Sequence, residues 1–172
     1  MSLTPKSLQD RISVLVALSA LLLLLSLAPA LLDATTSDRA NPIVAPDGWV
    51  QLFDGESTAA WRGYRKDVFP NHGWQVEDGW LQVMDGGGGG DIVTVQQYDD
   101  FELEMEWKAQ AGSNSGIMYL ANENNGASYF SAPEYQVFGD EDLTSNNNVS
   151  SGALYALYSP QNKKLNPPGE VN

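Results

Sequence analysis

The sequence contains no cysteine and a single histidine, His72, among its 172 residues. The absence of cysteine excludes disulfide bonds, thiolate catalysis, cysteine-ligated zinc and lipid attachment to an N-terminal cysteine. One histidine cannot supply a metal site that needs several imidazole ligands. We therefore expect no metal centre built from histidine or cysteine.

Basic residues are also scarce. The chain has 9 Lys and Arg against 22 Asp and Glu, which gives a formal net charge of −13. Binding to nucleic acid relies on a basic surface that neutralises phosphates, and this chain repels polyanions instead. The composition argues against a nucleic acid as the partner.

One long apolar run, residues 12–32, dominates the start of the chain and follows Lys6 and Arg11. It includes five consecutive leucines and contains the small-residue motif Ala28-Pro29-Ala30. A basic start, an apolar middle and a small-residue end are typical of an export signal, and the run also has the roughly 20 residues needed to span a bilayer. We predict a hydrophobic helix in residues 1–30, which is either a cleaved signal peptide or a retained membrane anchor. Both alternatives predict that the rest of the chain is exported, to the periplasm or beyond the cell, with membrane contact only through this segment.

The remaining sequence divides into a linker and one domain. Residues 31–47 are polar, include Pro42 and Pro46 and lack periodicity, as expected of a linker. Residues 48–172 show short aromatic and β-branched runs between turn signals, and no useful helical periodicity. This pattern predicts an all-β domain of the sandwich or barrel type.

Two strand patterns are clear. Residues 74–77 and 80–84 flank Asp78-Gly79, which suits a two-residue type I′ turn because both central residues need positive φ. Residues 101–107 alternate between apolar and polar side chains, as in a strand with one buried face. We expect shorter strands at residues 49–53, 92–95, 117–120, 135–138 and 154–158.

Two loops are rich in glycine or in oxygen-bearing side chains. Gly86 to Gly90 lacks the following Lys-Ser/Thr of a phosphate loop and is interpreted as a flexible hairpin connection. Residues 140–148 are rich in Asn and Asp, so they form either a solvated loop or a calcium site, although they lack the regular spacing of a helix-loop-helix calcium loop. Calcium is thus the one cofactor that the sequence leaves open.

Carboxylates at regular spacing offer a first candidate site. Glu102, Glu104 and Glu106 project from one side of a predicted strand, about 6.5–7 Å apart. Glycoside hydrolysis uses paired carboxylates at about 5–9 Å. Any solvent-facing strand with alternating charges gives the same spacing, so the pattern is not specific.

The segment 134–138 offers a second candidate site. Alternation places Glu134, Gln136 and Phe138 on one face of the strand. A carboxylate, an amide and an aromatic ring together suit a sugar, which presents hydroxyls and an apolar ring face. The same residues are equally compatible with the exposed side of an edge strand.

Several motifs resemble one known family, the 3-keto-disaccharide hydrolases, long catalogued as a bacterial domain of unknown function. The motifs occur in the family's order from about Gly48 to the end of the chain. They are Leu52-Phe53-Asp54-Gly55 with Trp61, residues 73–79, residues 98–102, Asn114-Ser115-Gly116-Ile117, Glu134-Tyr135-Gln136, Gly152-Ala153-Leu154-Tyr155 and Gly169-Glu170-Val171-Asn172.

The resemblance implies a concanavalin A-like jelly-roll β-sandwich with a concave face that receives a carbohydrate. It also implies an exported hydrolase that cleaves glycosidic bonds of 3-keto-glycosides and 3-keto-disaccharides by elimination and hydration. Such chemistry needs a base, a donor at the ketone oxygen and an acid for the leaving group. The family's motif assigns Glu134 as the catalytic acid/base and Gln136 as its polar neighbour, with Asn114, Asp140 and Tyr155 as substrate-binding residues.

The chain departs from the family pattern near its end. Members usually have Trp-Asn where this chain has Val171-Asn172, and they continue into further strands. We therefore expect a sandwich that is incomplete at the C-terminus, from either a fragment of a longer protein or a degenerate copy. The alternatives to an enzyme are a non-catalytic carbohydrate-binding module on the same fold and an inactive truncated copy.

Overall fold

The computed structural model describes residues 10–14, 43–44, 48–84 and 86–172. Within these residues the regular structure is β, apart from one short 3-10 turn, η1 (Ser128–Phe130). The prediction of an all-β fold is confirmed. The strands are β1 (Asp10–Val14), β2 (Ile43–Val44), β3 (Trp49–Gln51), β4 (Trp61–Gly63), β5 (Trp74–Glu77), β6 (Trp80–Val83), β7 (Ile92–Thr94), β8 (Phe101–Met105), β9 (Asn114–Met118) and β10 (Glu134–Phe138).

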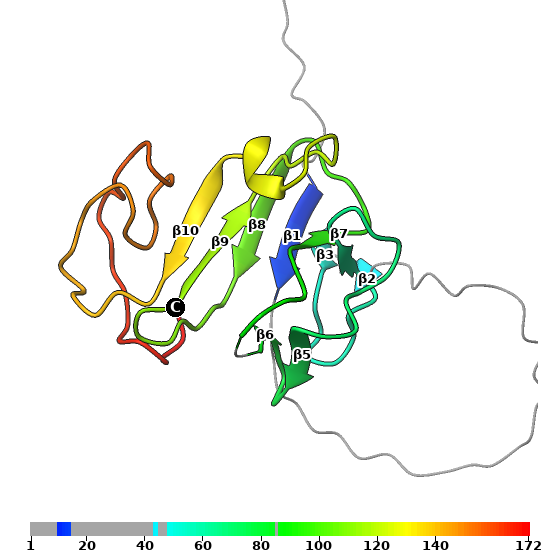
Figure 1. Ribbon diagram of the computed structural model, residues 1–172, viewed down its shortest axis with the longest axis horizontal. Helices are drawn as coiled ribbons and strands as arrows, with labels where there is room; N and C mark the ends of the chain where they lie inside the picture. The colour runs from blue at the N-terminus through cyan, green and yellow to red at the C-terminus, as the bar shows by residue number, and fades with distance from the viewer. Residues whose placement is uncertain (1–9, 15–42, 45–47, 85) are drawn as a thin grey trace, which may run out of the picture.

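The largest sheet has four strands in the order β2-β3-β1-β8, and the described residues also form three two-stranded pairs, β4-β7, β5-β6 and β9-β10. All pairs are antiparallel except those of β1, which runs parallel to β3 and to β8 (Figure 1). Residues 10–14 form strand β1, whereas a hydrophobic helix was predicted for residues 1–30, and the rest of that predicted helix lies outside the described ranges. Among the helices of the described ranges, none has the length and apolar character to cross a membrane.

A small apolar core joins β3 to β8. Val50 and Leu52 are buried, and Trp61, Phe101 and Leu103 pack against them. The indole nitrogen of Trp61 donates a 2.7 Å hydrogen bond to the Leu52 carbonyl oxygen, which satisfies its polar atom next to the core. This packing explains the alternation along β8, whose apolar residues are the less exposed ones.

The hairpin prediction is confirmed, and other boundaries needed correction. Asp78 and Gly79 both have positive φ, 51° and 78°, as the turn between β5 and β6 requires. Strand β9 begins at Asn114 rather than at residue 117, and β4 (Trp61–Gly63) was not predicted.

The predicted strand at residues 154–158 is wrong. These residues form a tight turn closed by an isolated bridge between Leu154 and Tyr158, with Ala156 in the left-handed region at φ 59°. Leu157 and Tyr158 are 65% and 71% exposed, so the aromatic and apolar residues that suggested a strand do not pack into a core.

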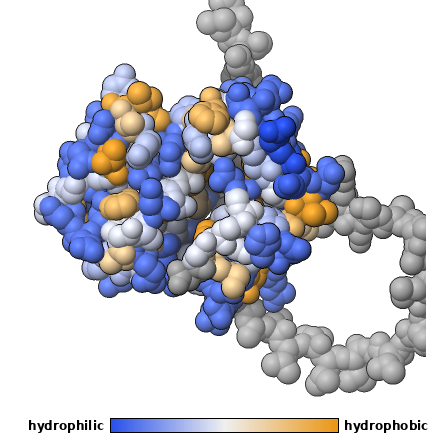
Figure 2. Space-filling view, in the orientation of Figure 1, coloured by the Kyte–Doolittle hydropathy of each residue, from blue (hydrophilic) through white to orange (hydrophobic). Residues whose placement is uncertain are grey.

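After β10, the described chain has no further helix or strand. Figure 1 shows this part of the chain, in orange and red, as an irregular lobe that follows β10 and ends at the C-terminus. The return ends against the residues that follow β8, where Trp107 and Asn172 exchange two backbone hydrogen bonds of 3.0 and 2.9 Å. Figure 2 shows a mainly hydrophilic surface on which apolar residues form separate spots.

Candidate functional site

The pairing of β9 with β10 brings most of the candidate residues onto one sheet face. Glu134 lies opposite Met118, Gln136 opposite Gly116, and Phe138 opposite Asn114. Since side chains alternate along a strand, Glu134, Gln136 and Phe138 share a face with Asn114.

A third segment extends this face beyond β10. The Tyr155 amide donates to the Glu134 carbonyl oxygen, and the Gln136 amide donates to the Ala153 carbonyl oxygen, each at 3.0 Å. Tyr135 and Leu154 form a bridge, so they share the opposite face. Tyr155 therefore stands on the Glu134 side of the ribbon.

Four of the five predicted site residues line a single hollow of about 210 Å³: Asn114, Gln136, Asp140 and Tyr155. The rest of its wall consists of Phe138, Ser145, Asn147, Val149 and Ser150. Amide, hydroxyl and carboxylate groups are thus combined with two aromatic rings, as in sites for small polar ligands that carry an apolar face. The fifth residue, Glu134, is not part of this wall and lies two positions before Gln136 on the same face.

Gln136 is deeply buried, with 2% exposure. Its Nε2 donates to Asn114 Oδ1 at 3.1 Å and to the Val149 carbonyl oxygen at 3.3 Å. Its Oε1 is shielded from solvent and has no hydrogen-bond partner among the described residues. Buried polar atoms nearly always have a hydrogen-bond partner, so Gln136 Oε1 is an exception that calls for a donor.

The carboxylate of Glu134 lies against the backbone of Gly116, where residue 116 has no side chain to occupy the space. Glu134 is partly buried. Desolvation, and secondarily the negative charge of Asp91, raise the pKa of Glu134 above its usual value. A carboxyl with a raised pKa is better matched to acid–base catalysis near neutral pH.

Asp140 combines its place in the wall with a structural role. Its Oδ2 accepts hydrogen bonds from Lys163 Nζ at 3.1 Å and from the Ser151 amide at 3.0 Å. The ion pair is buried, with side-chain exposures of 7% for Lys163 and 5% for Asp140. Asp140 thereby connects Ser151 to Lys163, which lies closer to the C-terminus.

Ser151 fixes the loop on the other side of the hollow. This residue is completely buried, and its hydroxyl donates to the Phe138 carbonyl oxygen at 2.6 Å and accepts from the Phe138 amide at 2.7 Å. Ser151 therefore holds the end of β10 in place, and it directly follows the residues 145–150 that line the hollow.

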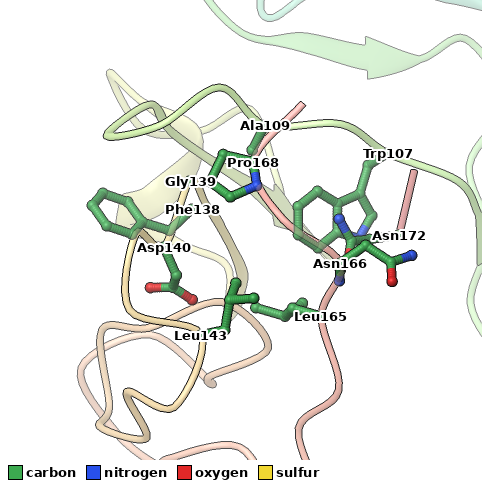
Figure 3. Close-up of a pocket in the computed structure, with 10 residues that line it drawn as sticks. All are labelled: Trp107, Ala109, Phe138, Gly139, Asp140, Leu143, Leu165, Asn166, Pro168 and Asn172. Carbon is green, nitrogen blue, oxygen red and sulfur yellow. Dashed lines mark hydrogen bonds between the residues drawn. The ribbon is translucent and has the colours of Figure 1, made fainter. Parts of the chain in front are cut away.

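A second crevice has a different character. It is lined by Trp107, Leu143, Leu165, Pro168 and neighbouring residues, and its volume is only about 10 Å³ (Figure 3). Such a space holds about one water molecule. It reflects the packing of the C-terminal segment on the residues after β8 and is too small for a sugar.

Sequence reasoning missed three residues that shape the site: Asp91, Ser151 and Lys163. Asp91 follows the glycine run, and its carboxylate accepts a hydrogen bond from the buried Ser128 hydroxyl. Only the folded arrangement relates Asp91 to Glu134 and Lys163 to Asp140, because each pair is separated by more than 20 residues in sequence. Ser151 belongs to the segment just before Gly152-Ala153-Leu154-Tyr155, and that position was its one signal.

Comparison with known proteins gives three similarities. The sequence model of the family described as the 3-keto-alpha-glucoside-1,2-lyase-like domain matches residues 48–172. A curated protein of Bacteroides thetaiotaomicron, named 3-keto-disaccharide hydrolase, is 39% identical over 165 residues; the match covers 82% of this chain and 56% of that protein. The chain thus spans about half the length of this curated relative. A crystal structure of a presumed glycosyl hydrolase from Parabacteroides distasonis matches with a TM-score of 0.54 and 28% identity, over 70% of this chain and 60% of the other.

Proposed function

The chain belongs to the family of 3-keto-alpha-glucoside-1,2-lyase-like domains, and on this basis we propose that it is a hydrolase that cleaves glycosidic bonds of 3-keto-glycosides, including 3-keto-disaccharides. One observation carries the proposal beyond family membership. Glu134, with its raised pKa, shares a sheet face with Asn114, Gln136 and Tyr155, beside a hollow that these three residues line.

The proposed reaction is an elimination followed by a hydration. A ketone at C3 acidifies the hydrogen on C2, so a base removes that proton and the electron pair moves first toward the ketone oxygen. When the electrons return, a double bond forms between C1 and C2, and the bond from C1 to the aglycone oxygen breaks. The aglycone oxygen takes up a proton. Water then adds across the double bond, with its oxygen on C1 and its hydrogen on C2.

Glu134 is the proposed acid/base residue. As a carboxylate it accepts a proton, and because desolvation raises its pKa it is a stronger base than an ordinary carboxylate and is protonated more often near neutral pH. Gln136, Asn114 and Tyr155 are the proposed contacts to the sugar. Asp140 is proposed to border the ligand while its ion pair with Lys163 holds the wall in place.

The finer features of the fold and the location of the protein belong to the same proposal. The all-β character of the described residues supports a concanavalin-like jelly roll. The basic start, apolar run and small-residue end of residues 1–30 support export, through a cleaved signal or a retained anchor. The calcium prediction rests on the Asn- and Asp-rich sequence of residues 140–148 alone, and the described residues contain no group of three acidic or histidine side chains arranged to hold a metal ion.

A matched pair of variants tests the function. The substrate is 4-nitrophenyl 3-oxo-α-D-glucopyranoside, whose cleavage releases a coloured aglycone. Glu134→Gln removes the proton-accepting group while keeping the shape of the side chain, and Glu104→Gln alters an exposed glutamate of β8 as the control. We expect kcat to fall about 10³-fold in Glu134→Gln alone, within the range for loss of an acid/base group. A wild-type chain that binds glucosides without turnover would instead identify a carbohydrate-binding module.

A further inference from the structure

The amide group of Gln136 has only one orientation that fits its surroundings. The carbonyl oxygen of Val149 can only accept a hydrogen bond, so the Gln136 atom that faces it, at 3.3 Å, must be the nitrogen. The second hydrogen of that nitrogen is directed to Asn114 Oδ1 at 3.1 Å. Both donors of the amide are therefore used within the protein.

The remaining atom, Gln136 Oε1, is an acceptor that no described residue satisfies. Gln136 is 2% exposed and belongs to the lining of the hollow, so Oε1 is a buried acceptor beside the ligand space and not one on the open surface. A buried acceptor without a donor costs free energy, and a ligand that supplies a donor recovers it.

Asn114 offers a hydrogen-bond donor, whereas Gln136 offers an acceptor. Its Oδ1 is occupied by Gln136, and its Nδ2 makes no hydrogen bond within the described ranges, so the group it offers to the hollow is a donor. Two neighbouring amides thus present one acceptor and one donor, in an order fixed by the Val149 carbonyl oxygen.

The groups around Gln136 suit a neutral hydroxyl better than a cation. The one carboxylate in the wall of the hollow, Asp140, already has its Oδ2 on the Lys163 ammonium group, and no second acidic side chain lines the hollow. A divalent cation prefers several oxygen ligands with net negative charge. A hydroxyl needs only the single free acceptor.

We propose that Gln136 is a specificity residue that reads one hydroxyl group of the sugar as a hydrogen-bond donor, and that a ketone is excluded from this position. A ketone oxygen cannot donate, so next to Gln136 Oε1 it would leave two acceptors facing each other. The oxidised carbon of the substrate is therefore turned away from Gln136, and the Asn114 amide nitrogen is the donor suited to an acceptor on the sugar. This inference rests on the proposed function in taking the ligand to be a glucoside.

The test compares glucosides that differ in a single hydroxyl. Methyl α-D-glucopyranoside and its 2-, 3-, 4- and 6-deoxy and deoxyfluoro derivatives are titrated against the full chain by NMR. Fluorine cannot donate a hydrogen bond, so at the position that Gln136 reads we expect the deoxy and deoxyfluoro compounds to bind about tenfold more weakly than the parent. In Gln136→Met, whose thioether is only a weak acceptor, we expect that difference to shrink strongly, whereas the exposed control Gln97→Met should reproduce the wild-type ratios.

Several results would overturn the inference. They are equal binding of all derivatives to the wild type, an unchanged tenfold penalty in folded Gln136→Met, the absence of glucoside binding, and a Ca²⁺ site that is lost in Gln136→Met. Should Gln136→Met not fold, the wild-type comparison of deoxy and deoxyfluoro compounds still decides.

Turnover of 4-nitrophenyl 3-oxo-α-D-glucopyranoside is measured separately. Hydroxyl discrimination without turnover refutes the proposed reaction alone, and turnover without discrimination refutes this inference alone.

Discussion

The carboxylate of Glu134 occupies the space next to Gly116 that a Cβ atom on residue 116 would fill. Gly116 lies opposite Gln136 in the register of β9 and β10, so the space is bounded by the neighbouring strand and not by a flexible loop. The glycine therefore allows a charged side chain to lie flat against the sheet, where burial raises its pKa.

Substituting Gly116 with alanine should displace Glu134 without unfolding the domain. The new methyl group overlaps the end of a side chain and not a backbone atom, and Gly116 does not have a positive φ. We expect Gly116→Ala to lower kcat on the 3-keto-glycoside about 100-fold, because misplacing a reacting group by about 1 Å has effects of that size. The melting temperature should change little.

Gly126→Ala is the control for this substitution. No atom lies within 4 Å of a Cβ at position 126, and that residue also lacks a positive φ. Its kinetics should match the wild type. Full activity in Gly116→Ala would mean that Glu134 does not act from the position described.

Removing Lys163 should strongly destabilise the domain. Lys163→Met leaves the Asp140 carboxylate buried without its counter-charge, a change that typically costs about 3–5 kcal/mol. Urea denaturation measures the effect, and Lys164→Met, at the exposed next residue, should be close to neutral. The double variant Asp140→Asn/Lys163→Met should recover part of the loss, and a single variant as stable as the wild type would contradict a buried pair.

Stability in acid should depend on Glu123. Hydrogen bonds from Arg62 at 2.7 and 2.6 Å, above all, lower the pKa of Glu123 from its usual 4.5 to about 2. An acid with a lowered pKa in the folded state contributes stability above pH 4.5, and this contribution is lost as the pH falls toward 2.

Glu123→Gln should therefore flatten the acid limb of the stability curve. The pair is partly exposed, at 20% for Arg62 and 31% for Glu123, so we expect only about 1 kcal/mol at pH 7. The difference from the wild type should shrink between pH 4.5 and pH 3 in urea titrations. A difference that stays constant with pH would show that the ion pair is not its cause.

Ser151→Ala tests the connection between β10 and the loop that lines the hollow. The substitution removes the acceptor of the Phe138 amide and leaves a buried N–H without its partner. The expected loss of unfolding free energy is about 2 kcal/mol. Ser159→Ala, on an exposed serine, serves as the reference, and equal stability of the two variants would refute the proposed bracing.

Local chemistry in the sequence was enough to predict several elements. Asp78-Gly79 supplies the two positive φ angles of a hairpin turn, and the apolar residues of β8 face Val50 and Leu52 as their alternation predicted. The family was identified from its motifs, and the family match over residues 48–172 confirms it. Strand β4 was missed because Trp61-Arg62-Gly63 is too short to show alternation.

The candidate site was only partly accessible from the sequence. Alternation placed Glu134 and Gln136 on one face, and the structure adds Asn114 and Tyr155 through strand pairing. Nothing in local sequence reports that Asp140 is buried against Lys163, because burial of a charge depends on a distant partner. The turn at residues 154–158 was mistaken for a strand because its aromatic residues have high β propensity while their side chains stay in solvent.

The residues that line the hollow lie partly on paired β-strands and partly on irregular backbone. Asn114 and Gln136 stand on paired strands, whereas Ser145, Asn147 and Val149 stand on the irregular stretch that follows. Insertions and substitutions in that stretch can reshape the rim while the hydrogen-bonded register beneath it keeps the reactive groups in place. For the proposed hydrolase, libraries aimed at new aglycones should therefore randomise the irregular side and leave the paired strands intact, so that leaving-group preference changes separately from the proposed chemistry.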